Sequence, residues 1–184
     1  MRPRHIRSTA LLVVALLGGC SLRAPVPSAA LAVGSQLELT RDLRVPPRRW
    51  SVYFQEGEAR RFGGIDSWRG YCELKVHGPK PQPQTIEAGV FEVTASDQYI
   101  DRTASREIHV AASAPVQLAL GERRDWNYVT ELALASSTQP DIRAFTCPRR
   151  QEARLGRFMS LAETRAAVGT YLKLKPASAI GVEQ

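Results

Sequence analysis

The stretch Arg69–Val76, with the sequence RGYCELKV, decides the fold. Polar and apolar side chains alternate along it, which is the two-residue period of a half-buried β-strand. Successive side chains of a strand point to opposite faces. We therefore predict an inward face and an outward face, made respectively by Cys72, Leu74 and Val76 and by Tyr71, Glu73 and Lys75.

Similar short stretches recur on both sides of this one. Some alternate, and others are rich in the β-branched and aromatic residues that strands favour. Pro46 and Pro47 interrupt the pattern that starts at Gln36, and Pro148 is expected to end its strand, because proline cannot donate a ladder hydrogen bond. The segment 128–135 also fits a helical period. We predict strands at 36–39, 50–55, 69–76, 89–94, 107–111, 116–120, 128–135, 142–147 and 171–174.

Turns and one helix complete the expected pattern. Glu56–Gly57 predicts a tight turn, and the proline-containing segment 78–84 predicts an exposed loop. Ser160 followed three residues later by Glu163 is typical of a capping box at a helix start. Gly169 is suited to end the same helix.

The fold class that follows is mainly β: an antiparallel β-sandwich or small barrel with one short C-terminal helix. A length of 184 residues fits one domain, and the 43% hydrophobic fraction is that of a globular protein. We expect a β-rich domain over 34–178 and a loose tail over 179–184.

The N-terminus predicts export from the cytoplasm. Arg2, Arg4 and Arg7 precede the uncharged run 10–19, which is half the length a membrane-spanning helix needs. A basic start followed by a short apolar run is typical of a secretory signal peptide, here residues 1–19. Residues 20–33 then form a membrane-proximal tether, whose 13 residues after Cys20 extend over at most about 45 Å.

Leu17-Gly18-Gly19-Cys20 resembles the lipobox of bacterial lipoproteins. This resemblance implies that Cys20 is lipidated, palmitate being a typical acyl chain, and that the leader is removed before it. Each buried methylene contributes about 0.8 kcal/mol, so two or three chains would hold the protein on a membrane. Ser21 stands where inner-membrane retention signals typically carry Asp, which favours the periplasmic face of the outer membrane. The order of a strand, the FQEG turn, a cysteine strand, the GVFEV strand and a late cysteine also resembles uncharacterised proteobacterial envelope lipoproteins, a resemblance that names no activity.

The remaining cysteines, Cys72 and Cys147, form an even pair in an exported domain, where disulfides are permitted. Closing a loop of 75 positions would stabilise the fold by about 4 kcal/mol on the chain-entropy model. Two buried thiols or two metal ligands are the alternatives. Neither cysteine has a CxxC partner, so the disulfide is the leading prediction and no metal site is expected.

No catalytic constellation is evident in the sequence. His77 and His109 lie outside any recognised nucleophile motif, and we interpret them as ordinary histidines. The carboxylate pairs Glu56/Glu58 and Asp97/Asp101 are interpreted as solvated loop charges. We therefore predict no enzyme activity and no cofactor.

Arginine is unusually frequent, with 21 arginines against 4 lysines. One interpretation is a loop surface that binds phosphate or carboxylate groups, because arginine donates paired hydrogen bonds to both. The simpler interpretation is a preference for arginine on solvated turns, with aromatic rings packed under the arginine stems. The candidate anion-binding residues are four adjacent pairs: Arg48 and Arg49, Arg60 and Arg61, Arg123 and Arg124, and Arg149 and Arg150.

The net charge of +7 falls once the leader is removed, because three arginines leave with it and 22 basic residues face 18 acidic ones. Export also separates the chain from nucleic acid, so no nucleic-acid partner is expected. The leading hypothesis is a lipid-anchored envelope protein whose periplasmic β-domain is a binding or assembly module for an envelope protein, lipopolysaccharide or peptidoglycan. An envelope hydrolase acting on peptidoglycan or lipid and a purely structural envelope protein are the alternatives.

Overall fold

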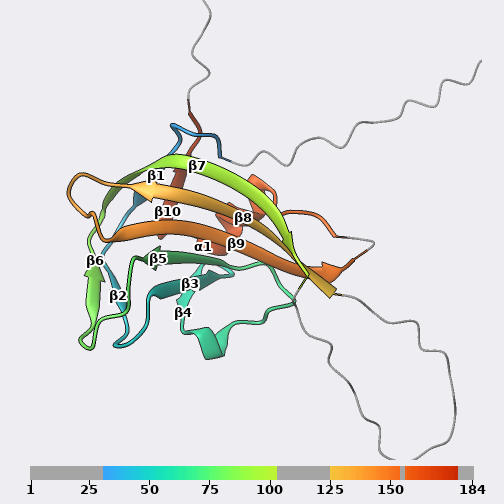
Figure 1. The fold of residues 1–184 in the computed structure, drawn as a ribbon, viewed down its shortest axis with the longest axis horizontal. Coiled ribbons are helices and arrows are strands. Elements are labelled where there is room, and N and C mark those ends of the chain that lie inside the picture. The colour runs from blue at the N-terminus through green and yellow to red at the C-terminus, as the bar shows by residue number, and fades with distance from the viewer. Residues whose placement is uncertain (1–30, 103–124, 154–155, 178–184) are drawn as a thin grey trace, which may run out of the picture.

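A curled antiparallel sheet with one short helix makes up the fold of the computed structural model, which describes residues 31–102, 125–153 and 156–177 (Figure 1). The predicted mainly-β class with a C-terminal helix is confirmed. The strands are β1 (Gln36–Leu39), β2 (Leu43–Val45), β3 (Ser51–Gln55), β4 (Glu58–Arg60), β5 (Cys72–Val76), β6 (Gln84–Ile86), β7 (Gly89–Asp101), β8 (Asp125–Ala135), β9 (Ile142–Glu152) and β10 (Leu172–Lys175).

Eight of these strands form one half-barrel in the order β10-β1-β7-β8-β9-β5-β3-β4. Every neighbouring pair is antiparallel. β2 and β6 pair separately as a two-stranded sheet, at the left end of the view in Figure 1. The long strands β7, β8 and β9 curve across the molecule, while β3 and β4 lie near one edge.

The alternation in β5 sorts its side chains as predicted. Cys72 and Leu74 are fully buried and Val76 is nearly so, whereas Glu73 and Lys75 are only half-buried. The inward side chains join a core to which every strand except β4 contributes a buried apolar residue. Its largest fully buried members are Phe54, Phe91 and Phe145.

The helix α1 (Leu161–Val168) begins and ends where predicted. Ser160 Oγ accepts a hydrogen bond from the Glu163 backbone, and the Glu163 side chain accepts one from the Ser160 N–H, so the capping box is confirmed. α1 contacts β3, β4 and β5 near one sheet edge and β10 at the other. The helix therefore fills the opening of the half-barrel, with Ala167 and Val168 buried.

The predicted Glu56–Gly57 turn is also confirmed, with φ of +57° and +82° at its two residues. The Gly57 N–H donates to the Ala167 carbonyl at 3.0 Å, which docks the turn between β3 and β4 on the end of α1. Gly169 lies against Gly57 so closely that a Cβ at Gly169 would be 2.6 Å from the Gly57 backbone. Both positions favour glycine. A Cβ at Gly169 would meet the Gly57 backbone, and both residues have a positive φ, which strains a residue with a side chain.

The prediction that Pro148 ends its strand is wrong, since β9 continues to Glu152. The Pro148 carbonyl accepts from the Tyr71 N–H, and the N and O of one strand residue point to the same side. The proline nitrogen therefore faces the side of β5, just before that strand begins at Cys72, and no bond to β8 is lost. Proline is tolerated at such a free edge.

The interpretation of Asp97 and Asp101 as loop charges is likewise wrong, because β7 extends well beyond Thr94 to Asp101. Its far half pairs with β8 alone and is mostly exposed. Because neither face of that half is buried, its sequence lacks the alternation of apolar and polar residues from which a strand is predicted. The short strands β4 and β6 were not expected for a similar reason: each has three residues and at most one of them is buried.

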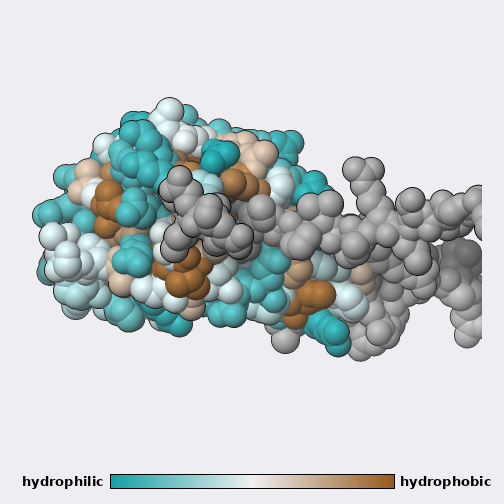
Figure 2. All heavy atoms as spheres, turned by 90° about the horizontal axis from the view of Figure 1, so that it is seen from above, coloured by the Kyte–Doolittle hydropathy of each residue, from teal (hydrophilic) through white to brown (hydrophobic). Residues whose placement is uncertain are grey.

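Some predicted elements lie outside the described residues, namely the strands at 107–111 and 116–120 and the tail at 179–184. Within the predicted tether, Leu31 is buried in the core, so the core includes part of that segment. Among the described residues, no helix is long and apolar enough to cross a membrane. Where grey atoms do not cover the face in Figure 2, its hydrophobic residues form small separate patches between hydrophilic ones.

Candidate functional site

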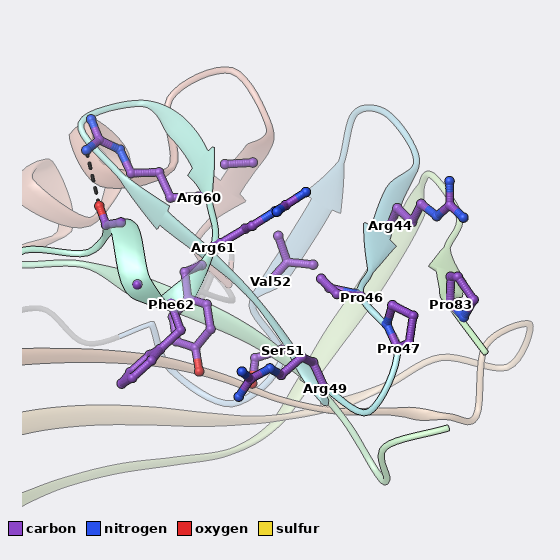
Figure 3. A pocket seen from close by; sticks show the side chains of 14 residues that line it. Arg44, Pro46, Pro47, Arg49, Ser51, Val52, Arg60, Arg61, Phe62 and Pro83 are labelled. Atoms are coloured by element: carbon purple, nitrogen blue, oxygen red, sulfur yellow. Dashed lines mark hydrogen bonds between the residues drawn. The ribbon is translucent and has the colours of Figure 1, made fainter. Parts of the chain in front are cut away.

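An open cleft of about 1140 Å³ lies where β3 and β4 face the segment that follows β2 (Figure 3). We call it the arginine cleft because four arginines line it. Arg44 comes from β2, Arg49 from the turn before β3, and Arg60 and Arg61 from the end of β4. Two of the predicted arginine pairs thus contribute to the arginine cleft: Arg60 and Arg61 both line it, whereas only Arg49 of the pair Arg48 and Arg49 does.

The charge in the arginine cleft is not balanced by its own lining, which contains no Asp or Glu. Arg60 pairs with Glu56 at 3.0 Å and also reaches the Gly64 carbonyl. Within the described parts of the chain, no ion pair is formed by Arg44, Arg49 or Arg61. Three guanidinium groups are therefore available to an anion.

A buried hydroxyl lies beside these arginines. Ser51 is 3% exposed, and its Oγ has no hydrogen-bond partner among the described residues. Leaving such a group unsatisfied costs free energy. The Oγ itself has almost no accessible surface, and the nearby polar side chain on which it acts is the Tyr53 phenol. In Figure 3, Arg49 lies next to Ser51, and Arg61 extends over Val52.

The rest of the lining is mainly apolar, with three prolines, Val52, Ala59 and two aromatic rings. The rings of Tyr53 and Phe62 are 5.5 Å apart, and Phe62 is 60% exposed. Burial, and then the nearby Glu73 carboxylate, raise the pKa of the Tyr53 phenol above its ordinary value. The Ser51 hydroxyl is close enough to oppose this rise, although it lacks hydrogen-bond geometry to the phenol. Tyr53 therefore stays neutral at physiological pH.

A turn positions Arg49. Pro46 and Pro47 end β2, and Arg48 follows with φ of +58°, in the left-handed region. Hydrogen bonds from the Arg48 N–H to the Lys80 carbonyl and from the Arg49 N–H to the Pro46 carbonyl fix this turn. Arg49 consequently lines the cleft, whereas Arg48 does not.

The third predicted pair has a different environment. Arg149 forms an ion pair with Glu163, and Arg157 joins the same carboxylate at 2.7 Å. Arg150 lies over the Trp68 ring at 4.3 Å and 3.6 Å from the Asp125 carboxylate. These arginines hold α1 and the ends of β8 and β9 in place, so they do not add to the arginine cleft.

The fourth predicted pair, Arg123 and Arg124, lies outside the described residues, as do the predicted lipidation site Cys20 and His109. The sequence argument missed Arg44 because it considered only adjacent arginines. Its signal was the alternation Leu43-Arg44-Val45, which places a single arginine on the outer face of a short strand.

The predicted Cys72–Cys147 disulfide is present, joining neighbouring strands β5 and β9 with the two Cα atoms 4.1 Å apart. Both cysteines are buried in the core. Within residues 31–102, 125–153 and 156–177, no three His, Cys, Asp or Glu side chains are grouped to hold a metal ion.

The other residues considered for chemistry do not line the arginine cleft. His77 is exposed next to β5, and its backbone N–H donates to the Asp141 carbonyl. Glu56 is used in ion pairs with the cleft residue Arg60 and with Arg69.

A separate charged cluster lies on the outer face of β5. Lys75 lies 2.8 Å from the Glu73 carboxylate and 3.8 Å from that of Glu131, so one lysine faces two carboxylates there.

No family model, no curated protein and no solved structure matches this chain.

Proposed function

We propose that this protein is a lipid-anchored envelope lipoprotein whose β-domain binds an anionic component of the cell envelope. The observation that supports this function best is the arginine cleft, where three arginines without ion-pair partners among the described residues line one mainly apolar cleft. Charge-assisted hydrogen bonds from guanidinium groups are the strong, directional contacts that phosphate and carboxylate groups require. The lipobox-like LGGC sequence supports the anchor and, with Ser21, the outer membrane.

A bound anion would supply the counter-charge that the lining of the arginine cleft lacks. Like charges gathered without a counter-charge repel one another, and an anion would remove that repulsion. We favour a binding module over a purely structural protein because the exposed arginines Arg44, Arg49 and Arg61 line one apolar cleft rather than separate solvated turns.

The anchor is tested by labelling bacteria that express the full chain with an alkyne analogue of palmitate. We expect the wild type and the neighbouring variant Ser21→Ala to incorporate the label and Cys20→Ala to lose it. Equal labelling of Cys20→Ala and wild type would exclude Cys20 as the lipidation site.

Anion binding is tested by the thermal stability of the full chain in neutral detergent with increasing pyrophosphate. A ligand that binds only the folded state raises the melting temperature. We expect a rise in the wild type and in Arg143→Gln, an exposed arginine outside the cleft, beyond that caused by potassium chloride of equal ionic strength. The double variant Arg49→Gln/Arg61→Gln should show no such rise. An equal rise in that double variant would contradict the proposed site.

A further inference from the structure

We infer that the arginine cleft binds an anionic phospholipid, with its phosphate among the arginines and part of its acyl chains on the apolar lining. This inference rests on the proposed function and names the ligand class of the same site. Three observations lead to it: the size of the cleft, the separation of polar from apolar lining, and an exposed aromatic side chain at its border.

The size of the cleft argues for a ligand larger than a free inorganic anion. Its volume of about 1140 Å³ lies slightly above the range of about 300–1,000 Å³ found for pockets that hold small organic molecules. A phosphate ion bound by these arginines would leave most of this space to water. A ligand that fills it must continue beyond its charged group.

The composition of the lining argues that the remainder of the ligand is apolar. Most of the exposed lining surface is apolar, and its uncharged polar side chains are the hydroxyls of Ser51 and Tyr53. A sugar or a peptide would bring many hydroxyl or amide groups that need partners there, and burying such groups unpaired is costly. A hydrocarbon chain needs none.

Phe62 supplies a specific apolar contact for such a chain. It belongs to the short 3-10 helix η1 (Phe62–Gly64), none of whose residues is buried. Its ring contacts Tyr53 yet remains 60% exposed, next to Arg61 in the chain. An aromatic ring beside a guanidinium group matches the junction between an acyl chain and a phosphate, where apolar and anionic parts of a lipid adjoin.

The position of the domain agrees with this ligand. If Cys20 is anchored as proposed, the tether keeps the start of the folded domain within about 45 Å of a membrane surface. Anionic phospholipids are then the most concentrated source of a phosphate joined to hydrocarbon. Their phosphodiester keeps one negative charge, which a single arginine fork can bind.

The test is isothermal titration of the full chain in neutral detergent with dihexanoyl phosphatidylglycerol, a short lipid that stays monomeric at high concentration. The comparison ligands are dihexanoyl phosphatidylcholine, pyrophosphate and hexaglutamate. We expect phosphatidylglycerol to bind at least tenfold more tightly than each of them. Arg61→Gln should weaken its binding about tenfold or more, the effect of losing one charge-assisted hydrogen bond, and Arg143→Gln should leave it unchanged.

Phe62→Ser separates the lipid inference from the proposed function. Because Phe62 is exposed, this variant is expected to fold, and its melting temperature and circular dichroism confirm that. We expect it to weaken phosphatidylglycerol several-fold and to leave pyrophosphate unchanged.

The remaining outcomes overturn one or both claims. If pyrophosphate or hexaglutamate binds as tightly as the lipid and Phe62→Ser has no effect, the lipid inference is wrong and anion binding stands. If phosphatidylcholine binds equally and Arg61→Gln has no effect, or if no ligand binds, both the inference and the proposed function are wrong.

Discussion

Two arginine-rich regions of this protein differ in how far carboxylates pair with their arginines. Around α1, Arg149 and Arg157 share the Glu163 carboxylate, which also caps the helix. In the arginine cleft, Arg49 and Arg61 have no carboxylate partner among the described residues. The difference teaches that an arginine pair in the sequence does not identify a site by itself. What matters is whether the fold supplies its counter-charge.

The two arginine-rich regions lie on the same sheet, and the Cys72–Cys147 disulfide crosslinks two strands of that sheet, β5 and β9. β5 pairs with β3 beside the cleft, and β9 contains Arg149. We expect Cys72→Ala/Cys147→Ala to lower the free energy of unfolding by about 4 kcal/mol, because the unfolded chain loses a 75-position loop constraint. Urea denaturation measures this loss. Cys20→Ala is the matched control and should unfold as the wild type does; an unchanged double variant would show that the crosslink adds no stability.

The contact between Gly57 and Gly169 joins the same two regions through backbone. Gly169→Ala would place a Cβ 2.6 Å from the Gly57 backbone at a residue with φ of +56°. We expect a loss of about 2 kcal/mol, since neither backbone can move without undocking α1 from the turn. Thermal denaturation measures it. Gly78→Ala, where a Cβ would meet nothing within 4 Å, should change stability by less than about 0.5 kcal/mol. Equal effects of the two variants would contradict the close contact.

On the paired side, Glu163→Gln tests whether its arginines are structural. Hydrogen bonds from Arg157 hold the pKa of the Glu163 carboxyl well below its ordinary value, and Ser160 and Arg149 add to this. A depressed pKa means that the carboxylate stabilises the fold above the unfolded-state pKa of about 4.3, and that this stabilisation fades as pH falls toward the lower native value. Glutamine keeps the capping hydrogen bond but not the charge. We expect a loss of about 1 kcal/mol at pH 7.

Urea denaturation of wild type and Glu163→Gln between pH 7 and pH 3 measures how the difference in their free energies of unfolding changes with pH. This difference should be constant above about pH 5 and shrink below about pH 4. A difference that grows on acidification would contradict the assigned ion pairs.

In the arginine cleft the expected effect on stability is the smallest. Arg49→Gln and Arg61→Gln remove no ion pair with the described residues, so each should change the free energy of unfolding by less than about 0.5 kcal/mol. The double variant relieves repulsion between like charges and should not be less stable than wild type. Urea denaturation at low salt, where such repulsion is least screened, is the measurement. A loss above about 1 kcal/mol would mean that these arginines have structural partners.

Local sequence patterns correctly predicted the features that depend only on residues close together in the chain. The alternation at 72–76 predicted the buried face of β5, and Ser160 with Glu163 predicted the start of α1, because strand faces and helix caps are settled within a few positions. The disulfide followed from the cysteine number and the expected export. Pro148 misled because its effect depends on which neighbouring strand its nitrogen faces, and that is decided by the pairing of β9 with β5 and β8.

The site could be predicted only in part. Arg49 and Arg61 were among the candidates, but their convergence depends on β4 lying at the edge of the sheet and on the turn after β2. Both features arise from pairings between distant segments. The pairing of Arg149 with Glu163 is also a tertiary contact, so the sequence could not show which arginine pair lacked counter-charges.

The dissociation constant of dihexanoyl phosphatidylglycerol in three matched proteins tests the central claim most directly. We predict that Arg49→Gln/Arg61→Gln raises this dissociation constant about a hundredfold over wild type, about tenfold for each lost charge-assisted contact. Arg149→Gln should leave the dissociation constant within about twofold of the wild-type value. Equal dissociation constants for wild type and the cleft double variant, or a larger effect of Arg149→Gln, would contradict the claim.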